Sequence, residues 1–451
     1  MSRASQVYAG VDIGNTKIII TIGRFVNERE FRILGSMVTP SEHFEDGEVL
    51  NVDRTAASIA FGIRQLSERF DVRVVDAFFG FSGHIESRQS VSVIDVANRE
   101  AITQSDLDSL RNQNLASKRE GREILDIFVT RYSLDDRMVK NPLGYKGYTL
   151  KADFIIVSGR SEQLNMLKKV AEKARLKLHG FVLHQVAAAK TLVSNDAKEA
   201  GVVVVDLGAD LTKVAVYYNN ALLHVSNIRM GGNIVTNDIK ALKQITFNAA
   251  SKVKHDFGYA LTDAIMEDSI IPLVDGSHGM GQKQFSLVGL SQIIQARLEV
   301  NFDLVANEIS KSNFYDAIGY GALLTGGGAY MRKVADLFTA RTGIESRVGL
   351  PVNPSFMGDT DIMSWPYFAV STGILLEGIE RPFQIPEQRS LFADDEIERD
   401  ERATKRNSSK SQNGRNEKTK VKGKSLWGGL VKTVGTIFDD EAMDTGKDTA
   451  I

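Results

Sequence analysis

The chain has 451 residues, of which 43% are hydrophobic and 25% charged, and its formal net charge is -2. This length is enough for two or more domains, and the near-neutral charge gives no overall reason to expect nucleic-acid binding. The absence of cysteine excludes disulfides, thiolate metal ligands and a cysteine nucleophile. No run reaches the roughly 20 apolar residues that span a bilayer, and the first residues have no secretory-signal pattern. These features favour a cytoplasmic protein that meets a membrane only at its surface.

Between Val7 and about Pro386, β-branched runs alternate with segments of helical periodicity. Strands are expected at residues 10–22, 202–217 and 317–325, and helices at residues 54–70, 162–174 and 331–341. This alternation is typical of an α/β fold. After Gln388 the composition becomes polar and charged as far as Lys424, which predicts a disordered linker.

Two similar motifs follow two of the predicted strands. They read Asp12-Ile13-Gly14-Asn15-Thr16-Lys17 and Asp206-Leu207-Gly208-Ala209-Asp210-Leu211-Thr212-Lys213. In each, a glycine permits a tight turn and lets backbone N–H groups approach a phosphate without a Cβ in the way. Asp12 and Asp206 could hold a magnesium ion through its waters, and Thr16 and Thr212 could donate hydroxyl hydrogen bonds. A single Asp-x-Gly also marks an ordinary hairpin turn, but two copies favour two similar domains that face each other.

A third glycine-rich motif ends the predicted strand at residues 317–325. Thr325 is followed by Gly326-Gly327-Gly328, and a helix is expected to open at about Met331. Consecutive glycines at such a junction let a planar base or a ribose lie against the backbone, near a helix N-terminus. A flexible loop is the alternative, although such loops rarely follow so apolar a strand.

The polar linker is basic and leads into an amphipathic segment. Nine Lys or Arg and one acidic residue, Glu417, lie between Arg402 and Lys424. At 3.6-residue spacing, one face of segment 425–439 is apolar and consists of Leu426, Trp427, Leu430, Val431, Val434, Ile437 and Phe438. Each glycine in it costs about 1 kcal/mol relative to alanine, so we expect the helix to form when that face is buried in an anionic membrane. The alternatives are a helix that docks on its own domain and a basic linker that contacts RNA, although interleaved aromatic residues are absent.

The two Asp-x-Gly motifs and the triple glycine, in this order, resemble the actin/Hsp70/sugar-kinase superfamily. Within it the chain is similar to the FtsA family of bacterial cell-division proteins. The segments that carry this similarity are residues 81–87 (FSGHIES), 121–125 (GREIL), 140–144 (KNPLG), 231–239 (GGNIVTNDI) and 365–373, which opens with WPYFA. The similarity covers most of residues 7–380 and the tail.

The resemblance implies an actin-like two-lobed α/β fold with an inserted family-specific subdomain, and with ATP and Mg bound between the lobes. The implied boundaries are 1–83 and 159–196 for the first lobe, 84–158 for the insertion, 197–390 for the second lobe with a small subdomain at about 231–300, 391–424 for the linker and 425–439 for the membrane helix. The final helix of the second lobe would return to the first lobe. The resemblance also adds Gly232 and Lys254 to the residues expected near the nucleotide.

Three features depart from the family pattern. Asp210 stands where the second phosphate loop has a glycine, and a carboxylate there repels phosphate unless a cation intervenes. Ser251 replaces an acidic residue expected three positions before Lys254. His184 and Gln185 precede an alanine-rich helix, where either could orient a hydrolytic water or simply start the helix. These changes favour nucleotide as a conformational ligand, with at most weak ATP hydrolysis and no catalytic residue assigned.

The resemblance further implies a scaffold at the cytoplasmic face of the cell membrane, at the division site. It would polymerise with ATP bound, tether the tubulin-like protein FtsZ through the C-terminal helix, and meet later division proteins. The FtsZ C-terminal peptide is expected on the small subdomain, where Arg297 is a candidate contact; a solvated surface arginine is the alternative. Two other interpretations stay open: an ATPase or small-molecule kinase, and another actin-like assembly scaffold.

Overall fold

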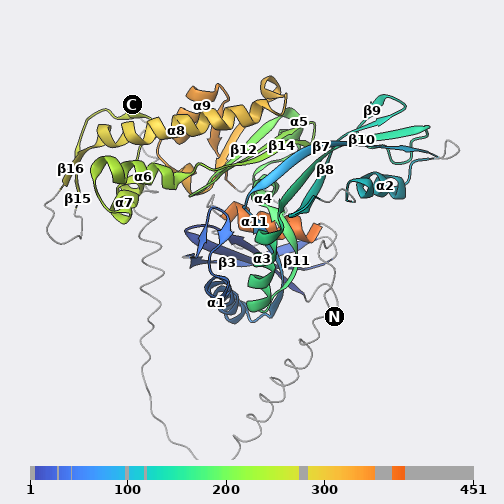
Figure 1. Cartoon of the computed structure of the whole chain (residues 1–451), viewed down its shortest axis with the longest axis horizontal. Helices are drawn as coiled ribbons and strands as arrows, with labels where there is room; N and C mark the ends of the chain where they lie inside the picture. Colours follow the sequence, from blue (N-terminus) through green and yellow to red (C-terminus); the bar gives the residue numbers. More distant parts are fainter. Residues whose placement is uncertain are drawn as a thin grey trace, which may run out of the picture. The chain divides into compact units, whose positions relative to one another are not determined.

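The computed structural model describes residues 6–27, 30–41, 43–96, 101–115, 119–273, 283–350 and 368–380. The expected linker and membrane helix therefore lie outside the described residues. Two five-stranded sheets and one four-stranded sheet carry most of the described chain (Figure 1). None of the helices in these ranges is long and apolar enough to cross a bilayer.

The first sheet has the strand order β11-β6-β1-β2-β3. Its strands are β1 (Val7–Ile13), β2 (Lys17–Phe25), β3 (Phe31–Pro40), β6 (Val74–Phe81) and β11 (Lys177–Leu183). The central strand β1 is antiparallel to β2 and parallel to β6. Helices cover both faces of this sheet: α1 (Val52–Phe70) and α3 (Ser161–Lys173) on one, α4 (His184–Leu192) and α11 (Phe368–Glu380) on the other (Figure 1). This explains why β1 and β2 are nearly continuous apolar runs instead of alternating ones.

The second sheet repeats this arrangement with the order β14-β13-β12-β17-β18. Its strands are β12 (Val202–Leu207), β13 (Thr212–Tyr218), β14 (Ala221–Ile228), β17 (Gly321–Thr325) and β18 (Ser346–Val348). β12 is antiparallel to β13 and parallel to β17, as β1 is to β2 and β6. The helices α5 (Asn195–Ala200), α8 (Leu287–Ser310) and α9 (Val334–Thr342) accompany this sheet. The internal similarity seen in the two motifs thus extends to two sheets of the same topology.

The predicted helices differ from the observed ones mainly at their ends. α1 begins two residues earlier than expected because the Asn51 side chain accepts a hydrogen bond from the Arg54 backbone and caps it. The helix expected from Met331 starts only at Val334, since Lys333 adopts a left-handed conformation with φ of 64°. The triple glycine instead leads into a 3₁₀ turn, Gly327–Tyr330.

A smaller group of elements lies between β14 and the second half of α8. It contains α6 (Gly232–Lys243), α7 (Phe247–Phe257), the 3₁₀ turn Thr262–Ala264 and the hairpin of β15 (Ile270–Leu273) and β16 (Lys283–Ser286). These elements share a core with the first turns of α8, in which Ile239, Leu290 and Ile294 are fully buried. A further 3₁₀ turn, Tyr315–Ala317, precedes β17.

The four-stranded sheet has the order β7-β10-β8-β9 and its own hydrophobic core. Its elements are β7 (Ile85–Asp95), α2 (Gln104–Leu115), β8 (Arg122–Leu134), β9 (Arg137–Val139) and β10 (Thr149–Arg160). We call it the insertion sheet, because it interrupts the first sheet between β6 and β11. A short hairpin of β4 (Phe44–Glu45) and β5 (Glu48–Val49) connects β3 to α1.

The helix α11 is held against the first sheet by glycines. A Cβ on Gly10 of β1 would lie 2.5 Å from the Ser371 carbonyl oxygen, and a Cβ on Gly373 of α11 would overlap the Ala187 carbonyl of α4. Every residue of α11 from Phe368 to Leu376 is buried. The close backbone approach therefore depends on residues without a side chain.

We predict that Gly373→Ala lowers the free energy of unfolding by about 1–3 kcal/mol, because the new methyl group has no room beside Ala187. Urea denaturation followed by circular dichroism measures this change. Gly289→Ala in α8 is the matched control, because its Cβ would find its nearest neighbour at 3.6 Å, an ordinary contact distance. Equal stability of the Gly373 variant and the control would contradict this account of the packing.

Candidate functional site

The first predicted phosphate loop forms the turn between β1 and β2. The Gly14 backbone N–H donates to the Lys17 carbonyl at 3.0 Å and closes it. Asp12 ends β1 with its carboxyl 13% exposed, and the Oδ1 atom lies 3.4 Å from Nε2 of His184 on α4. The pKa of Asp12 is raised to about 7, mainly by burial; the Lys213 charge opposes the rise, the Asp206 carboxylate adds to it, and Lys17 opposes it.

The second loop repeats this turn between β12 and β13. Gly208 N–H donates to the Leu211 carbonyl at 3.0 Å. The Lys213 ammonium donates to Oδ2 of Asp206 at 2.8 Å, and both side chains are buried. The Thr212 hydroxyl donates to the Met230 carbonyl at 2.7 Å, so its proton is committed to the backbone. Thr16, its counterpart in the first loop, is exposed.

Asp210 bridges two separate segments. Its Oδ2 accepts from the backbone N–H of Asp46, in the β4–β5 turn, at 2.9 Å, and its Oδ1 accepts from Nδ2 of Asn233 on α6 at 2.7 Å. The loop is thus reshaped so that protein donors satisfy this carboxylate. Repulsion of phosphate was expected here from the carboxylate alone, whereas the bond to Asp46 has no signal in the local sequence.

The triple glycine passes directly over the second loop. Gly326 has φ of +83°, and a Cβ there would overlap the Asp206 carboxylate. A Cβ on Gly328 would lie 2.7 Å from the Leu207 side chain, whereas one on Gly327 would meet nothing within 4 Å. The first and third glycines therefore permit close packing on β12, and the middle one has open space beside it.

Lys254 on α7 lies at the start of α6. Its ammonium donates to the Gly232 carbonyl and to the Thr236 hydroxyl, each at 2.7 Å. Burial lowers the pKa of Lys254 to about 8, and among the described residues no carboxylate pairs with it. Gly232 N–H in turn donates to the Gly208 carbonyl at 3.0 Å, so Lys254 is tied to the second loop. Ser251 is half-buried one turn earlier on α7.

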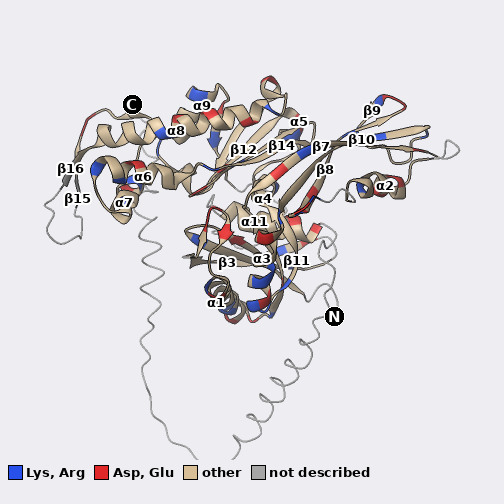
Figure 2. Cartoon of the chain, in the orientation of Figure 1, with Lys and Arg blue, Asp and Glu red and all other residues tan. Residues whose placement is uncertain are grey.

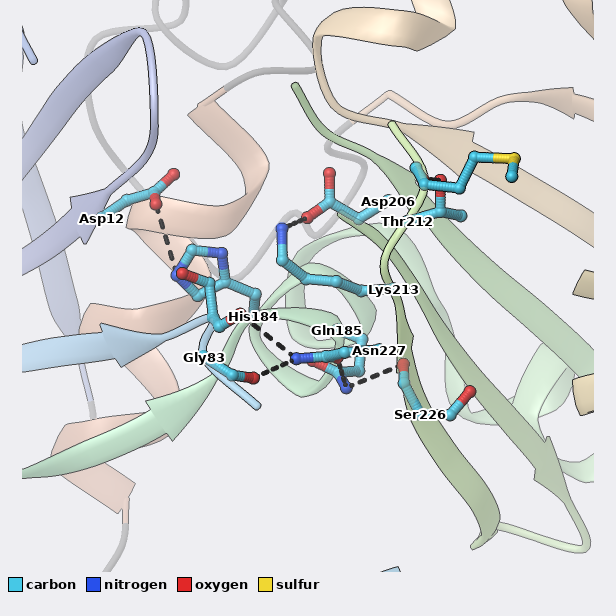
Figure 3. A network of polar contacts seen from close by, with 11 residues as sticks. Asp12, Gly83, His184, Gln185, Asp206, Thr212, Lys213, Ser226 and Asn227 are labelled. Carbon is cyan, nitrogen blue, oxygen red and sulfur yellow. Dashed lines mark hydrogen bonds and ion pairs between the residues drawn. The ribbon is translucent and has the colours of Figure 1, made fainter. Parts of the chain in front are cut away.

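His184 and Gln185 occupy different positions in a polar network (Figure 3). Burial, aided by the Lys213 charge, lowers the pKa of His184 well below its ordinary value, so the imidazole is neutral. Gln185 Nε2 donates to Oδ1 of Asn227 on β14 at 3.0 Å, and Asn227 Nδ2 donates to the Gly83 carbonyl at 2.7 Å. Asn227 and Gly83 join the second sheet to the end of β6, a link that no local sequence pattern indicated.

Several buried polar atoms around the described loops are left without hydrogen bonds. Four buried atoms in this part of the structure make no hydrogen bond, namely Asp12 Oδ1, Asn15 Oδ1, His184 Nε2 and Gln185 Oε1, although Asp12 Oδ1 and His184 Nε2 lie 3.4 Å apart. Such atoms are costly unless a ligand or water binds them. Within the described ranges no group of three or more His, Asp or Glu residues is arranged to hold a metal ion. Asp12 retains an oxygen for a hydrated magnesium ion, but Asp206 Oδ2 already binds Lys213.

The remaining predicted site residues lie elsewhere. Arg297 on α8 forms a two-pronged ion pair with Asp238 on α6, with nitrogen–oxygen distances of 2.5 and 3.0 Å. Its side chain is 32% exposed. The seven apolar residues assigned to membrane binding, Leu426 to Phe438, are outside the described residues.

Two family models match separate parts of this chain. The model of cell division protein FtsA matches residues 203–373, and the model of the SHS2 domain inserted in FtsA matches residues 82–158. The chain belongs to the FtsA family. The second match coincides with the insertion sheet, which identifies that sheet as the SHS2 domain of this FtsA-family protein.

Individual relatives agree with this assignment. The FtsA of Neisseria meningitidis serogroup B is 28% identical over 379 residues, which cover 83% of this chain and 91% of that protein. The FtsA of Pseudomonas aeruginosa is 26% identical over 383 residues, with 84% and 91% covered. A solved structure of a PilM–PilN type IV pilus biogenesis complex superimposes with a TM-score of 0.58 at 16% identity, covering 84% of this chain and 100% of that one. The expected α/β, actin-like fold with an inserted subdomain is thereby confirmed.

Because the pKa of Asp12 is raised on folding, the ionised Asp12 carboxylate should lower the free energy of unfolding of this FtsA-family protein. Between pH 4 and pH 7 the folded state holds the Asp12 proton more tightly than the unfolded state, so the free energy of unfolding falls as pH rises through this range. Asp12→Asn removes the titrating group. The variant should be more stable than the native chain at pH 8, by up to about 4 kcal/mol, and the difference should vanish near pH 4.

Thermal unfolding of both proteins from pH 4 to pH 8 measures this effect. Asp263→Asn is the control, because that carboxylate is exposed in the 3₁₀ turn after α7. A native chain that matches Asp12→Asn at pH 8 would show that the carboxylate is not desolvated.

Proposed function

We propose that this protein is an actin-like cell-division scaffold that binds ATP, polymerises at the cytoplasmic face of the cell membrane and tethers FtsZ there. One observation carries the nucleotide part of this proposal. Two Asp-x-Gly turns and a triple-glycine loop, distant in sequence, meet around Asp12, Asp206 and Lys213. Membership of the FtsA family supports the division part.

The chemistry of these loops fits a nucleoside triphosphate. ATP would supply a chain of phosphate charges and a flat adenine surface. The Gly14 and Gly208 turns present backbone without side chains, and the buried acceptors Asn15 Oδ1 and Asp12 Oδ1 would accept hydrogen bonds from waters around the phosphates. Lys254 brings a buried ammonium with no acidic partner among the described residues to the first turn of α6. Gly327 has space beside it for a base or ribose.

The groups that could activate water are poorly placed for rapid turnover. His184 is neutral and buried, and its Nε2 faces Asp12. The Gln185 amide nitrogen is bound to Asn227, and the side chain is fully buried. A water held by Gln185 Oε1 would permit slow hydrolysis. We therefore propose that ATP acts mainly as a conformational ligand.

Two contacts near the proposed phosphate loops could change when such a ligand binds. Asp210 joins the second loop to the β4–β5 turn, and Asn227 joins β14 to Gly83 after β6. Both contacts connect the two five-stranded sheets at the loops proposed to hold phosphate. A ligand that changes the spacing of these loops would change both contacts.

The membrane part of the proposal is supported by sequence. The segment 425–439 has one apolar face and follows a basic stretch. An amphipathic helix of this kind gains free energy when its apolar face is buried at the lipid interface, and the basic residues add attraction to anionic headgroups.

Substitution on the apolar face of the full-length chain should therefore abolish membrane binding. We predict that Leu430→Asp reduces sedimentation with anionic vesicles by about tenfold or more, because a charge would enter the acyl region. Thr433→Asp is the matched control, since it introduces the same charge on the polar face. Equal loss in both variants would indicate electrostatic binding alone, and unchanged binding in both would refute the tether.

The partner part rests on Arg297 in the helical group of α6, α7 and α8. The Asp238 carboxylate holds Arg297 at the junction of α6 and α8, where the guanidinium remains 32% exposed. We propose that the exposed edge of this guanidinium binds an acidic group of the FtsZ C-terminal peptide.

Exchanging the charges of Asp238 and Arg297 distinguishes peptide binding by Arg297 from its contribution to the stability of the fold. The double variant Asp238→Arg with Arg297→Asp keeps an ion pair, and should bind a labelled FtsZ C-terminal peptide about tenfold more weakly in fluorescence anisotropy. Arg297→Lys should retain part of the affinity. Native affinity in the exchanged variant would mean that Arg297 is only a structural residue.

A further inference from the structure

Lys213 is an unusual residue for its position in the second sheet. The strands of this sheet are drawn mostly in tan in Figure 2. By sequence, β12, β13, β14 and β17 contain only two residues of the Asp, Glu, Lys and Arg type, and these are Asp206 and Lys213. The two residues are direct partners in the β12–β13 register, and their side chains are only 6% and 8% exposed. A buried pair of this kind loses the hydration of both charges, so its presence calls for a reason beyond stability.

The Lys213 ammonium lies where the loops of the proposed nucleotide site meet. It lies 3.5 Å from the position that a Cβ on Gly208 would occupy, immediately under the second phosphate loop. It binds one oxygen of Asp206, whose other oxygen lies against Gly326 of the triple glycine. Its charge also acts on Asp12 and His184, on the side of the first loop (Figure 3). The second loop and the triple glycine therefore meet at this cation, and Asp12 of the first loop lies within reach of its charge.

One of the two carboxylates in this cluster is not free to hold a metal. Asp12 lies close enough to feel the charges of Lys17 and Lys213, but only Asp206 is bound directly by an ammonium, that of Lys213. A magnesium ion binds through carboxylates with oxygens to spare, usually by way of its waters. Asp206 has given one oxygen to Lys213 and packs the other against Gly326. It is therefore a poor partner for a hydrated metal ion.

We propose that the Lys213 ammonium supplies, within the protein, the positive charge that a bound magnesium ion would otherwise supply to the phosphates. ATP then binds to this protein without a divalent cation. This inference rests on the proposed nucleotide function and differs from the sequence-based expectation that Asp206 holds Mg through water. A lysine ammonium is a compact point charge, well suited to neutralise a phosphate oxygen from beneath a glycine turn.

Titration calorimetry with ATP, in magnesium and in EDTA, tests the inference on the full chain. The native protein should bind with dissociation constants that agree within about threefold in the two conditions. Lys213→Met should bind about tenfold or more weakly in EDTA, with recovery in magnesium, because Asp206 is released to the metal. Lys213→Arg should behave as the native protein does, and Lys240→Met, on the exposed side of α6, is the control. Weakening of native binding by tenfold in EDTA would overturn the inference, as would native-like binding by Lys213→Met in EDTA.

Melting temperatures measured without nucleotide test the role of Lys213 independently of ATP binding. The native protein should melt at the same temperature in magnesium and in EDTA, whereas Lys213→Met should melt lower and be raised by magnesium. Where Lys213→Met does not fold, the double variant with Asp206→Asn removes both charges of the pair and should lose ATP binding in both conditions. Absence of ATP binding by the native chain in both conditions would refute the nucleotide function. An equal magnesium-induced rise for the native chain and Lys213→Met would refute the role of Lys213.

Discussion

Two tight turns, between β1 and β2 and between β12 and β13, determine where the buried charged residues of the two Asp-x-Gly motifs lie. In each five-stranded sheet the next-to-last residue of a central apolar strand is an aspartate, and a single backbone hydrogen bond then closes the turn into an antiparallel partner. The geometry places a carboxylate at the end of a strand that is otherwise buried on both faces. Such a carboxylate loses hydration, which is why the Asp12 pKa is raised, and it needs a compensating cation nearby. The lysine that ends each motif, Lys17 or Lys213, provides that cation.

The same turns also connect the halves of the molecule. Asp210, at the tip of the second turn, binds the Asp46 backbone, and the neighbouring Asn227 binds the backbone at Gly83. A Cβ on Gly47, beside Asp46, would lie only 2.6 Å from Gly83 Cα, so the two contacts converge on one small region of the first half. The loops around the proposed phosphate site are therefore also the places where the two sheets are joined. If a nucleotide binds at these loops as proposed, it would act on the relative position of the sheets through shared residues instead of a long chain of contacts.

Much of this arrangement was predictable from sequence, because glycine and aspartate spacing has direct backbone consequences. The strand–turn–strand form of both motifs followed from Gly14 and Gly208, and the fold class followed from the alternation of strands and helices. The ion pair of Lys213 with Asp206 depends on the register of β12 and β13, which the motif alone does not determine. The bond between Asp210 and Asp46 joins residues 164 positions apart, and local patterns carry no information about such pairs. Resemblance supplied Gly232 and Lys254, whose placement beside the second loop no spacing rule would have given.

The position of α11 has a consequence for how the protein is made. β1 is among the first elements to leave the ribosome, but it packs against α11, the last helix in the described part of the chain, through the close approach of Gly10 to Ser371. The core of the first sheet therefore cannot be completed until residues 368–380 have been synthesised. Its folding must finish late in translation or after it. The amphipathic segment is made later still. We infer that the order of synthesis gives the body its chance to fold before the segment proposed to bind a membrane has been made.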